Sequence, residues 1–96
     1  MRQAFMCSLI RRGILGGGLY LDGQALTYKT QKLTVDARYR NLVLPLKEIR
    51  EVTWQGILPV AAFRMADGEE YRFLIFNKGR FIRCFEEYWK RAPENG

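Results

Sequence analysis

The sequence predicts a mainly β fold that is closed by one C-terminal α-helix. Three observations lead to this class. Turn residues recur at intervals of about 8–12 residues, apolar and polar residues alternate between them, and the last stretch changes to a helical period. The chain has 96 residues, of which 48% are hydrophobic, as in one globular domain. We expect a single domain over 1–96, with its core at about 5–91 and a frayed tail at 92–96.

The first half of the chain begins with a predicted strand and a hairpin. Residues 5–10 are rich in apolar side chains and predict a strand, with residues 11–16 as the loop that follows it. Residues 19–21 and 25–28 flank Asp22-Gly23. This dipeptide favours a tight hairpin turn, because it tolerates the positive φ that such turns require.

The middle of the chain is polar before it becomes apolar again. Residues 29–41 predict a long loop or an extended strand end, and residues 42–46 predict the next strand. Pro45 cannot donate a ladder hydrogen bond, so that strand ends there or lies at a sheet edge. A bend and then a further strand are expected around Ile49, Val52 and Trp54.

Two more strands complete the expected sheet. Residues 55–59 form a break, residues 60–66 a strand, and Asp67-Gly68 a second hairpin turn. Apolar and polar residues then alternate over residues 69–76. The total of about seven strands is typical of a sandwich or a partly open barrel.

The C-terminal stretch predicts an amphipathic helix over about 79–91, with Asn77 as its N-cap. One face of this helix is apolar, which indicates that it packs against the open end of the sheet. We interpret that face as core and not as a cofactor site. It carries Phe81, Phe85, Tyr88, Trp89 and Ala92.

The sequence lacks the residues on which most catalytic and metal sites depend. It contains no His and only two cysteines, Cys7 and Cys84, so a zinc site of the usual ligand types cannot be assembled. A nucleophilic cysteine would need an adjacent base, and the neighbouring carboxylates are not expected to converge. We therefore expect that the chain is not an enzyme and that it binds neither a metal nor a cofactor. The cysteines are expected to be buried thiols in a reducing compartment, with a disulfide as the alternative.

The glycine-rich stretch from Gly13 to Gly18 does not predict a nucleotide site. It lacks the Gly-Lys-Ser/Thr ending of a phosphate loop, and no helix follows it. We interpret it as a flexible loop between two strands.

The formal net charge is +6, which favours anionic partners such as lipid headgroups, nucleic acid or an acidic protein. Solubility alone is the alternative explanation of this charge. No apolar run approaches the ~20 residues that cross a bilayer, and the N-terminal apolar segment is too short for a signal peptide. We expect a cytoplasmic protein, with peripheral attachment to a membrane as a further expectation.

An ordered series of motifs resembles the GRAM and bacterial pleckstrin-homology-like domains over roughly residues 5–91. The resemblance implies seven strands in two near-orthogonal sheets capped by a C-terminal helix, without catalysis, and binding of membrane phospholipid or protein. Asp22 and Phe81 stand where the family often has Thr and Trp. The motifs are Gly17–Leu21, Ala25–Tyr28, Leu44–Val52, Gly56–Pro59 and Asp67–Phe73, followed by the aromatic helix.

In the pleckstrin-like layout, the loops after the first and third strands lie near one end of the domain. Basic side chains in these loops would meet phosphate oxygens, and each is worth about 1 kcal/mol near an anionic leaflet. Glu69 and Glu70 near the same end would oppose an anion, and a solvated basic face is the alternative. The candidate lipid-binding residues are Arg11, Arg12, Lys29, Lys32, Arg38 and Arg40.

Two alternative functions use other residues. Ile57 and Leu58 are candidate apolar loop contacts for a bilayer or a protein, although we favour a loop that packs onto the core. Together with a strand edge near Pro45, they would serve a protein-interaction or self-association module. Nucleic-acid binding would require an exposed aromatic among cations, and Tyr39 between Arg38 and Arg40 is the candidate.

Overall fold

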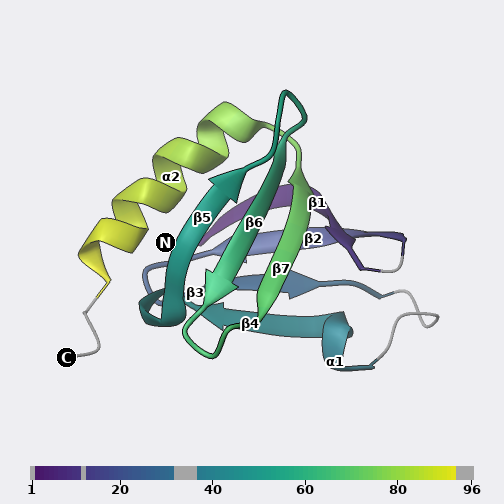
Figure 1. Cartoon of the computed structure of the whole chain (residues 1–96), viewed down its shortest axis with the longest axis horizontal. Coiled ribbons are helices and arrows are strands. Elements are labelled where there is room, and N and C mark those ends of the chain that lie inside the picture. Colours follow the sequence, from purple (N-terminus) through teal and green to yellow (C-terminus); the bar gives the residue numbers. More distant parts are fainter. Residues whose placement is uncertain (1, 12, 32–36, 93–96) are drawn as a thin grey trace.

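A computed structural model of the chain describes residues 2–11, 13–31 and 37–92, with Ala37 and Arg38 described by their backbone alone. All strand pairs are antiparallel and form one seven-stranded sheet in the order β4-β3-β2-β1-β7-β6-β5. In Figure 1 the sheet bends so that β5–β7 cross steeply over β2–β4. The strands are β1 Gln3–Ile10, β2 Ile14–Leu21, β3 Ala25–Lys29, β4 Asn41–Pro45, β5 Ile49–Trp54, β6 Val60–Met65 and β7 Glu70–Ile75.

The predicted fold class is confirmed, since one C-terminal helix, α2 (Lys78–Arg91), accompanies the seven strands. The expected bend before β5 is a short 3-10 helix, η1 (Leu46–Glu48). The strand that was expected to stop at Pro45, or to lie at an edge, does both. A short helix, α1 (Ala37–Arg40), interrupts the segment that was expected to be a loop or strand end.

The glycine run differs from the sequence prediction. Gly16, Gly17 and Gly18 lie within β2 and pair with Ser8, Cys7 and Met6 of β1, so the expectation of a flexible loop at 11–16 was wrong beyond residue 13. The glycine run is extended because each of its residues pairs with a residue of β1. A glycine is tolerated in such a strand where another part of the chain approaches closely.

The two predicted Asp-Gly turns are present, but they work differently. Gly68 has a φ of 92°, as a tight turn favours, whereas Gly23 is not among the positive-φ residues of the described chain. At the first turn the Asp22 carboxylate accepts hydrogen bonds from the N–H groups of Gln24 and Ala25, at 2.8 and 2.9 Å. These bonds stabilise the charged form, so they lower the pKa of Asp22.

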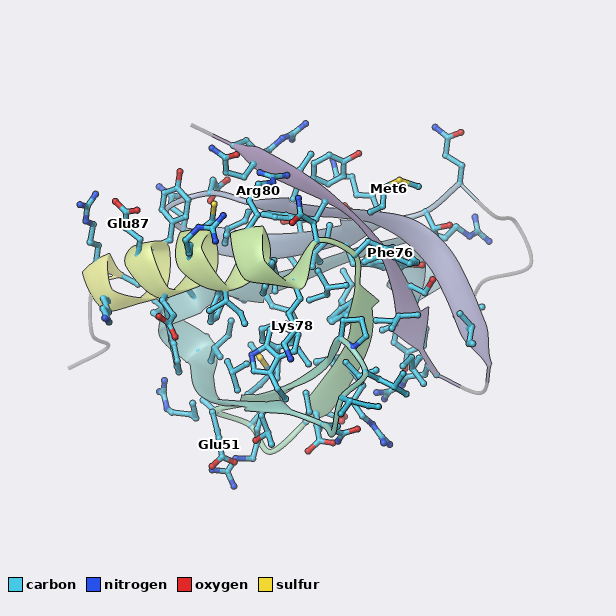
Figure 2. All side chains as sticks on the ribbon, turned by 90° about the horizontal axis from the view of Figure 1, so that it is seen from above. Met6, Glu51, Phe76, Lys78, Arg80 and Glu87 are labelled. Carbon is cyan, nitrogen blue, oxygen red and sulfur yellow. The ribbon has the colours of Figure 1, made fainter. Side chains whose placement is uncertain are left out.

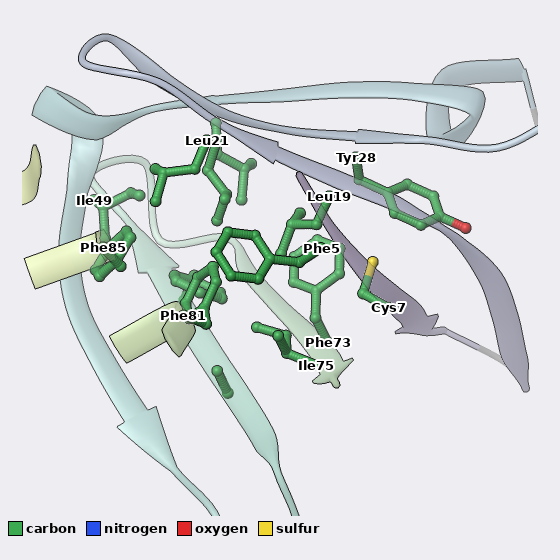
Figure 3. Packing of buried hydrophobic residues seen from close by; sticks show 14 of the residues in the cluster. Phe5, Cys7, Leu19, Leu21, Tyr28, Ile49, Phe73, Ile75, Phe81 and Phe85 are labelled. Carbon is green, nitrogen blue, oxygen red and sulfur yellow. The ribbon is translucent and has the colours of Figure 1, made fainter. Parts of the chain in front are cut away.

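The core lies between the two halves of the sheet and receives the aromatic face of α2 (Figure 3). Phe81 is fully buried, and its ring meets Phe5 edge-on at 5.0 Å and stacks on Phe85 at 5.5 Å. Phe85 in turn contacts Phe63 at 5.5 Å. Edge-on and offset aromatic pairs of this kind add to the stabilisation from burial. The prediction that the helix packs by its aromatic face is therefore confirmed.

The helix lies along β5 and is held at both of its ends. Near its first turn Phe81 meets Trp54, the last residue of β5, with ring centroids 6.2 Å apart. Near its last turn the Trp89 indole N–H donates to the carbonyl of Ile49, the first residue of β5, at 3.3 Å. Asn77 occupies the N-cap position as predicted, but with a φ of 61° and no side-chain cap hydrogen bond.

Candidate functional site

An open hollow of about 810 Å³ lies beside the glycine run, where β2 extends beyond the end of β3. The β2–β3 ladder ends at Gly18 and Lys29, so the earlier part of β2 borders the hollow and not another ladder. The residues just after β3 and just before β4 form the opposite wall. The lining residues are Gly16, Gly17, Gly18, Tyr20, Lys29, Thr30, Gln31, Arg40 and Asn41.

The glycines allow buried and half-buried groups to pack closely beneath this hollow. A Cβ atom on Gly17 would lie 2.5 Å from the Lys29 carbonyl oxygen and 2.8 Å from Cε1 of Tyr28. The Tyr28 hydroxyl donates to the Leu15 carbonyl at 2.7 Å, and the Thr30 hydroxyl donates to the Gly16 carbonyl at 3.0 Å. Burial raises the pKa of Tyr28, so its phenol keeps the proton that makes this bond.

Cations dominate the electrostatics of the hollow. Lys29 and Arg40 line it, and none of its nine described lining residues is acidic. Lys29 Nζ lies 5.9 Å from the centroid of the Tyr20 ring, and the Arg2 guanidinium carbon lies 4.6 Å from the same ring. The aromatic ring thus holds two cations at the rim. Such a surface attracts phosphate, sulfate or carboxylate groups.

Arg11 does not join Lys29 and Arg40. Its guanidinium carbon lies 5.2 Å from the Tyr39 ring centroid and 5.3 Å from the Tyr71 ring centroid. Its Nη1 also donates to the Glu70 carbonyl at 3.1 Å. Arg11 therefore attaches the β1–β2 turn to the start of β7. The small hollow of about 240 Å³ around it is also lined by Glu69, which opposes an anion as expected.

The remaining basic candidates are described only in part. Arg12 and Lys32 lie outside the described residues, as does the side chain of Arg38, whose backbone belongs to α1. Tyr39, the aromatic on which the nucleic-acid alternative depended, is buried in the core and contacts Arg11. A buried ring cannot serve as a stacking platform for bases.

The other titratable groups do not form a reactive site. Cys7 is buried, and burial raises the pKa of its thiol to about 12, so it remains protonated and a poor nucleophile. Cys84 is partly buried, and both cysteines are free thiols. Within the described part of the chain, no three His, Cys, Asp or Glu side chains gather where they could hold a metal ion.

The apolar loop candidates are exposed, and so are further apolar residues that were not singled out in the sequence, among them Met6, Val43 and Phe76. Ile57 and Leu58 protrude from the β5–β6 loop, so the favoured expectation that this loop packs onto the core was wrong. Met6 belongs to β1, and Phe76 comes just after β7. The alternation in β1, which turns Phe5 and Cys7 inward, was a signal that Met6 faces outward.

Comparison with known proteins gives matches at the level of structure. No protein-family model and no curated protein matches the sequence. The chain superposes on the C-terminal domain of an unknown protein from Leishmania infantum with a TM-score of 0.76, at 8% identity, over 92% of this chain and 82% of that one. It superposes on the N-terminal PH domain of the human ARAP2 protein with a TM-score of 0.72, at 14% identity, over 94% of this chain and 80% of that one.

The chain has a pleckstrin-homology-like fold. A third structure, that of Inner Membrane Complex Sub-compartment Protein 3 from Toxoplasma gondii, agrees with a TM-score of 0.62, at 15% identity, over 94% of this chain and 75% of that one. A shared fold does not determine function, which depends on the surface that each domain carries. Among the described residues, no helix has the length and apolar character needed to cross a bilayer.

Proposed function

We propose that this chain is a non-catalytic PH-like module that attaches weakly to anionic phospholipid surfaces through the hollow beside β2. The observation that carries the proposal is the composition of the hollow, in which Lys29 and Arg40 occur with polar amides and no acidic residue. Arg12 falls between β1 and β2 in the sequence, and Lys32 and Arg38 fall between β3 and β4, so these residues would add to the positive charge. We further propose that the module is GRAM-like, because its motifs follow the family order from Gly17–Leu21 through Leu44–Val52 to Asp67–Phe73.

The chemistry of the hollow suits a phosphate group. A guanidinium can donate two parallel hydrogen bonds to phosphate oxygens, an ammonium supplies a point charge, and the amides of Gln31 and Asn41 add neutral donors. Each basic residue contributes about 1 kcal/mol near an anionic leaflet. The attachment is therefore weak, reversible and sensitive to salt. The two free thiols are compatible with a location in the reducing cytoplasm.

Co-sedimentation with phosphatidylcholine vesicles, with and without phosphatidylserine, tests this proposal. The intact chain should bind only the anionic vesicles, and less so at high salt. The variant K29Q/R40Q should bind about tenfold more weakly or worse, because two contributions of about 1 kcal/mol are removed. The control R83Q/K90Q removes the same charge from exposed positions of α2 and should lose less binding.

Two further outcomes of this experiment decide the ligand. Competition by soluble glycerol phosphate would indicate a site for the phosphate group itself, whereas its absence would indicate that the charged surface of a leaflet is needed. Equal binding to neutral and anionic vesicles, or binding to neither, would remove the proposed function.

A second function, protein interaction, is favoured by the free edge of β4. A hollow of about 290 Å³ separates this edge from the β6–β7 turn, and apolar side chains contribute to its lining. A partner strand could pair with the edge, as in β-strand addition. Sedimentation velocity of the intact chain and of V43K tests for self-association there. A monomer at every concentration would contradict self-association. The lining residues are Val43, Leu44, Pro45, Glu48, Met65, Ala66, Asp67 and Tyr71.

A further inference from the structure

Four large apolar side chains form an exposed surface at the end of the sheet from which α2 begins. Their exposed fractions are 75% for Met6, 99% for Ile57, 62% for Leu58 and 52% for Phe76. We call these four residues the apolar strip. Scattered exposed apolar residues are ordinary, whereas adjoining ones mark a contact surface.

Backbone hydrogen bonds show that the parts of the strip adjoin one another. The N–H of Phe76 donates to the carbonyl of Met6 at 3.1 Å, which brings the end of β7 beside β1. The N–H of Ile75 donates to the carbonyl of Pro59 at 2.8 Å, which brings the β5–β6 loop beside the same point. The three segments that carry the strip, which are distant in sequence, are therefore neighbours in the fold.

Two cations are held beside the strip. Lys78 Nζ lies 4.9 Å from the centroid of the Trp54 ring at the base of the β5–β6 loop. Arg80 donates from Nη2 to the Ala4 carbonyl at 2.6 Å and from Nη1 to Oε1 of Gln3 at 3.0 Å. Figure 2, which looks down on this end, shows Lys78 and Arg80 between Met6 and Phe76 on one side and Glu87 on the other.

The segments that build this end contain no acidic residue. Residues 2–8, 52–62 and 73–85 carry Arg2, Lys78, Arg80 and Arg83 but neither Asp nor Glu. Acidic residues occur instead in the β6–β7 turn, at the opposite end of β6 and β7. The charge distribution is thus polarised along these strands, and the apolar strip lies at the cationic end.

We propose that the apolar strip inserts into the headgroup–acyl boundary of an anionic bilayer while Lys78 contacts lipid phosphates. Arg80, which is bonded to Gln3 and Ala4, holds the start of α2 against β1 beside the strip. This inference rests on the proposed membrane attachment, but the surface that it concerns is separate from the hollow. An aliphatic tip that protrudes, as the β5–β6 loop does at the top of Figure 1, can enter a fluid bilayer without a matching pocket. A flanking cation then binds the phosphates above the inserted side chains.

Met6 of the strip and Lys29 of the hollow face the same side of the sheet. Lys29 pairs with Gly18 across the β2–β3 ladder, and Gly18 pairs with Met6 across the β1–β2 ladder. Directly paired residues of adjacent strands project to the same face of a sheet. On this face the Tyr20 side chain lies over Gly18, between Met6 and Lys29.

Vesicle binding by I57S/L58S tests the insertion. Both side chains are exposed, so the fold is retained, which circular dichroism checks. Binding to phosphatidylcholine–phosphatidylserine vesicles should fall about tenfold or more, because two large apolar side chains no longer leave water. The control A66S changes an exposed side chain in the β6–β7 turn, at the opposite end of β6 from the strip, and should bind as the intact chain does.

A depth measurement provides an independent readout. In the variant L58W, brominated acyl chains in anionic vesicles should quench fluorescence beyond the background of Trp54 and Trp89. The matched variant A66W, in the β6–β7 turn, should show no added quenching. Quenching that is equal in the two variants, or absent from both, would overturn the insertion.

The outcomes separate this inference from the proposed function. If K29Q/R40Q loses binding while I57S/L58S binds normally, the hollow stands and the insertion fails. If I57S/L58S loses binding while K29Q/R40Q does not, the insertion stands and the hollow fails as the lipid site. If I57S/L58S instead abolishes a self-association of the intact chain and leaves vesicle binding unchanged, the strip is a protein contact and the insertion is wrong.

Discussion

Gly17 packs against the ring of Tyr28 so closely that a Cβ atom at residue 17 would lie 2.8 Å from Cε1 of that ring. The same atom would lie 2.5 Å from the carbonyl oxygen of Lys29, which belongs to the backbone and cannot move aside as a flexible side chain can. The glycine run therefore has a packing role, which is to let β3 and its tyrosine approach β2.

The substitution Gly17→Ala should lower the free energy of unfolding by about 1–3 kcal/mol, as overpacked sites do. Gly79→Ala is the matched control. Gly79 lies in the first turn of α2, and a Cβ there would come no nearer than 3.7 Å to Arg83, its closest neighbour. That control should stabilise the protein by about 0.5–1 kcal/mol through helix propensity. Urea unfolding followed by circular dichroism measures both, and equal stabilities would contradict the close approach.

The strands were predictable because alternation is a local signal. Residues 60–66 and 69–76 were expected to be strands, and β6 and β7 occupy 60–65 and 70–75. The role of Gly17 could not be predicted in this way, because it depends on Tyr28 from another strand. The aromatic face of α2 was predictable, since Phe81 and Phe85 share one side of any helix.

The candidate site was predictable only in part, for a similar reason. Lys29 is the last residue of β3 and Arg40 immediately precedes β4, so their places at the ends of predicted strands located them. Arg11 lies in an equally basic loop, but its side chain is held by Tyr39 and Tyr71 from distant parts of the chain. Contacts of this kind depend on the strand register and on the path of the loops, and local sequence patterns predict neither.

Phe81 should contribute more to stability than any exposed residue of α2. It is fully buried and contacts four other aromatic rings, so Phe81→Ala should lower the free energy of unfolding by about 3–5 kcal/mol. The control Arg83→Ala changes an exposed position of the same helix and should stay within about 0.5 kcal/mol of the unsubstituted chain. Urea unfolding measures both, and a small loss for Phe81→Ala would mean that the helix does not close the core.

Stability should fall in alkali because Cys7 is buried as a neutral thiol. Burial raises the pKa of Cys7 from 9.0 to about 12, so the unfolded chain loses its thiol proton first as the pH rises. The contribution is complete below pH 9 and is lost toward pH 12, at up to about 1.4 kcal/mol per pH unit. Urea unfolding of the intact chain and of Cys7→Ala across this range measures the slope. Cys7→Ala should show a shallower slope, and identical slopes would contradict the assignment.

Arg11 should act as a structural residue and not as a lipid ligand. Two cation–π contacts and a hydrogen bond to the Glu70 carbonyl engage its guanidinium, so Arg11→Gln should lower the free energy of unfolding by about 1–2 kcal/mol. Lys29→Gln, at an exposed position, should leave stability within about 0.5 kcal/mol of the unsubstituted chain.

Vesicle binding by the same two variants should give the opposite order. Glu69 lies beside Arg11, so an anion gains little there, whereas no acidic residue lines the hollow beside Lys29. Lys29→Gln should therefore weaken binding to phosphatidylserine-containing vesicles about fivefold, and Arg11→Gln should weaken it less. If Arg11→Gln reduced binding more than Lys29→Gln at a temperature where both remain folded, the anionic surface would meet the β1–β2 turn. The lipid site would then lie around Arg11, at the acidic end of the strands, and the hollow would not be the contact.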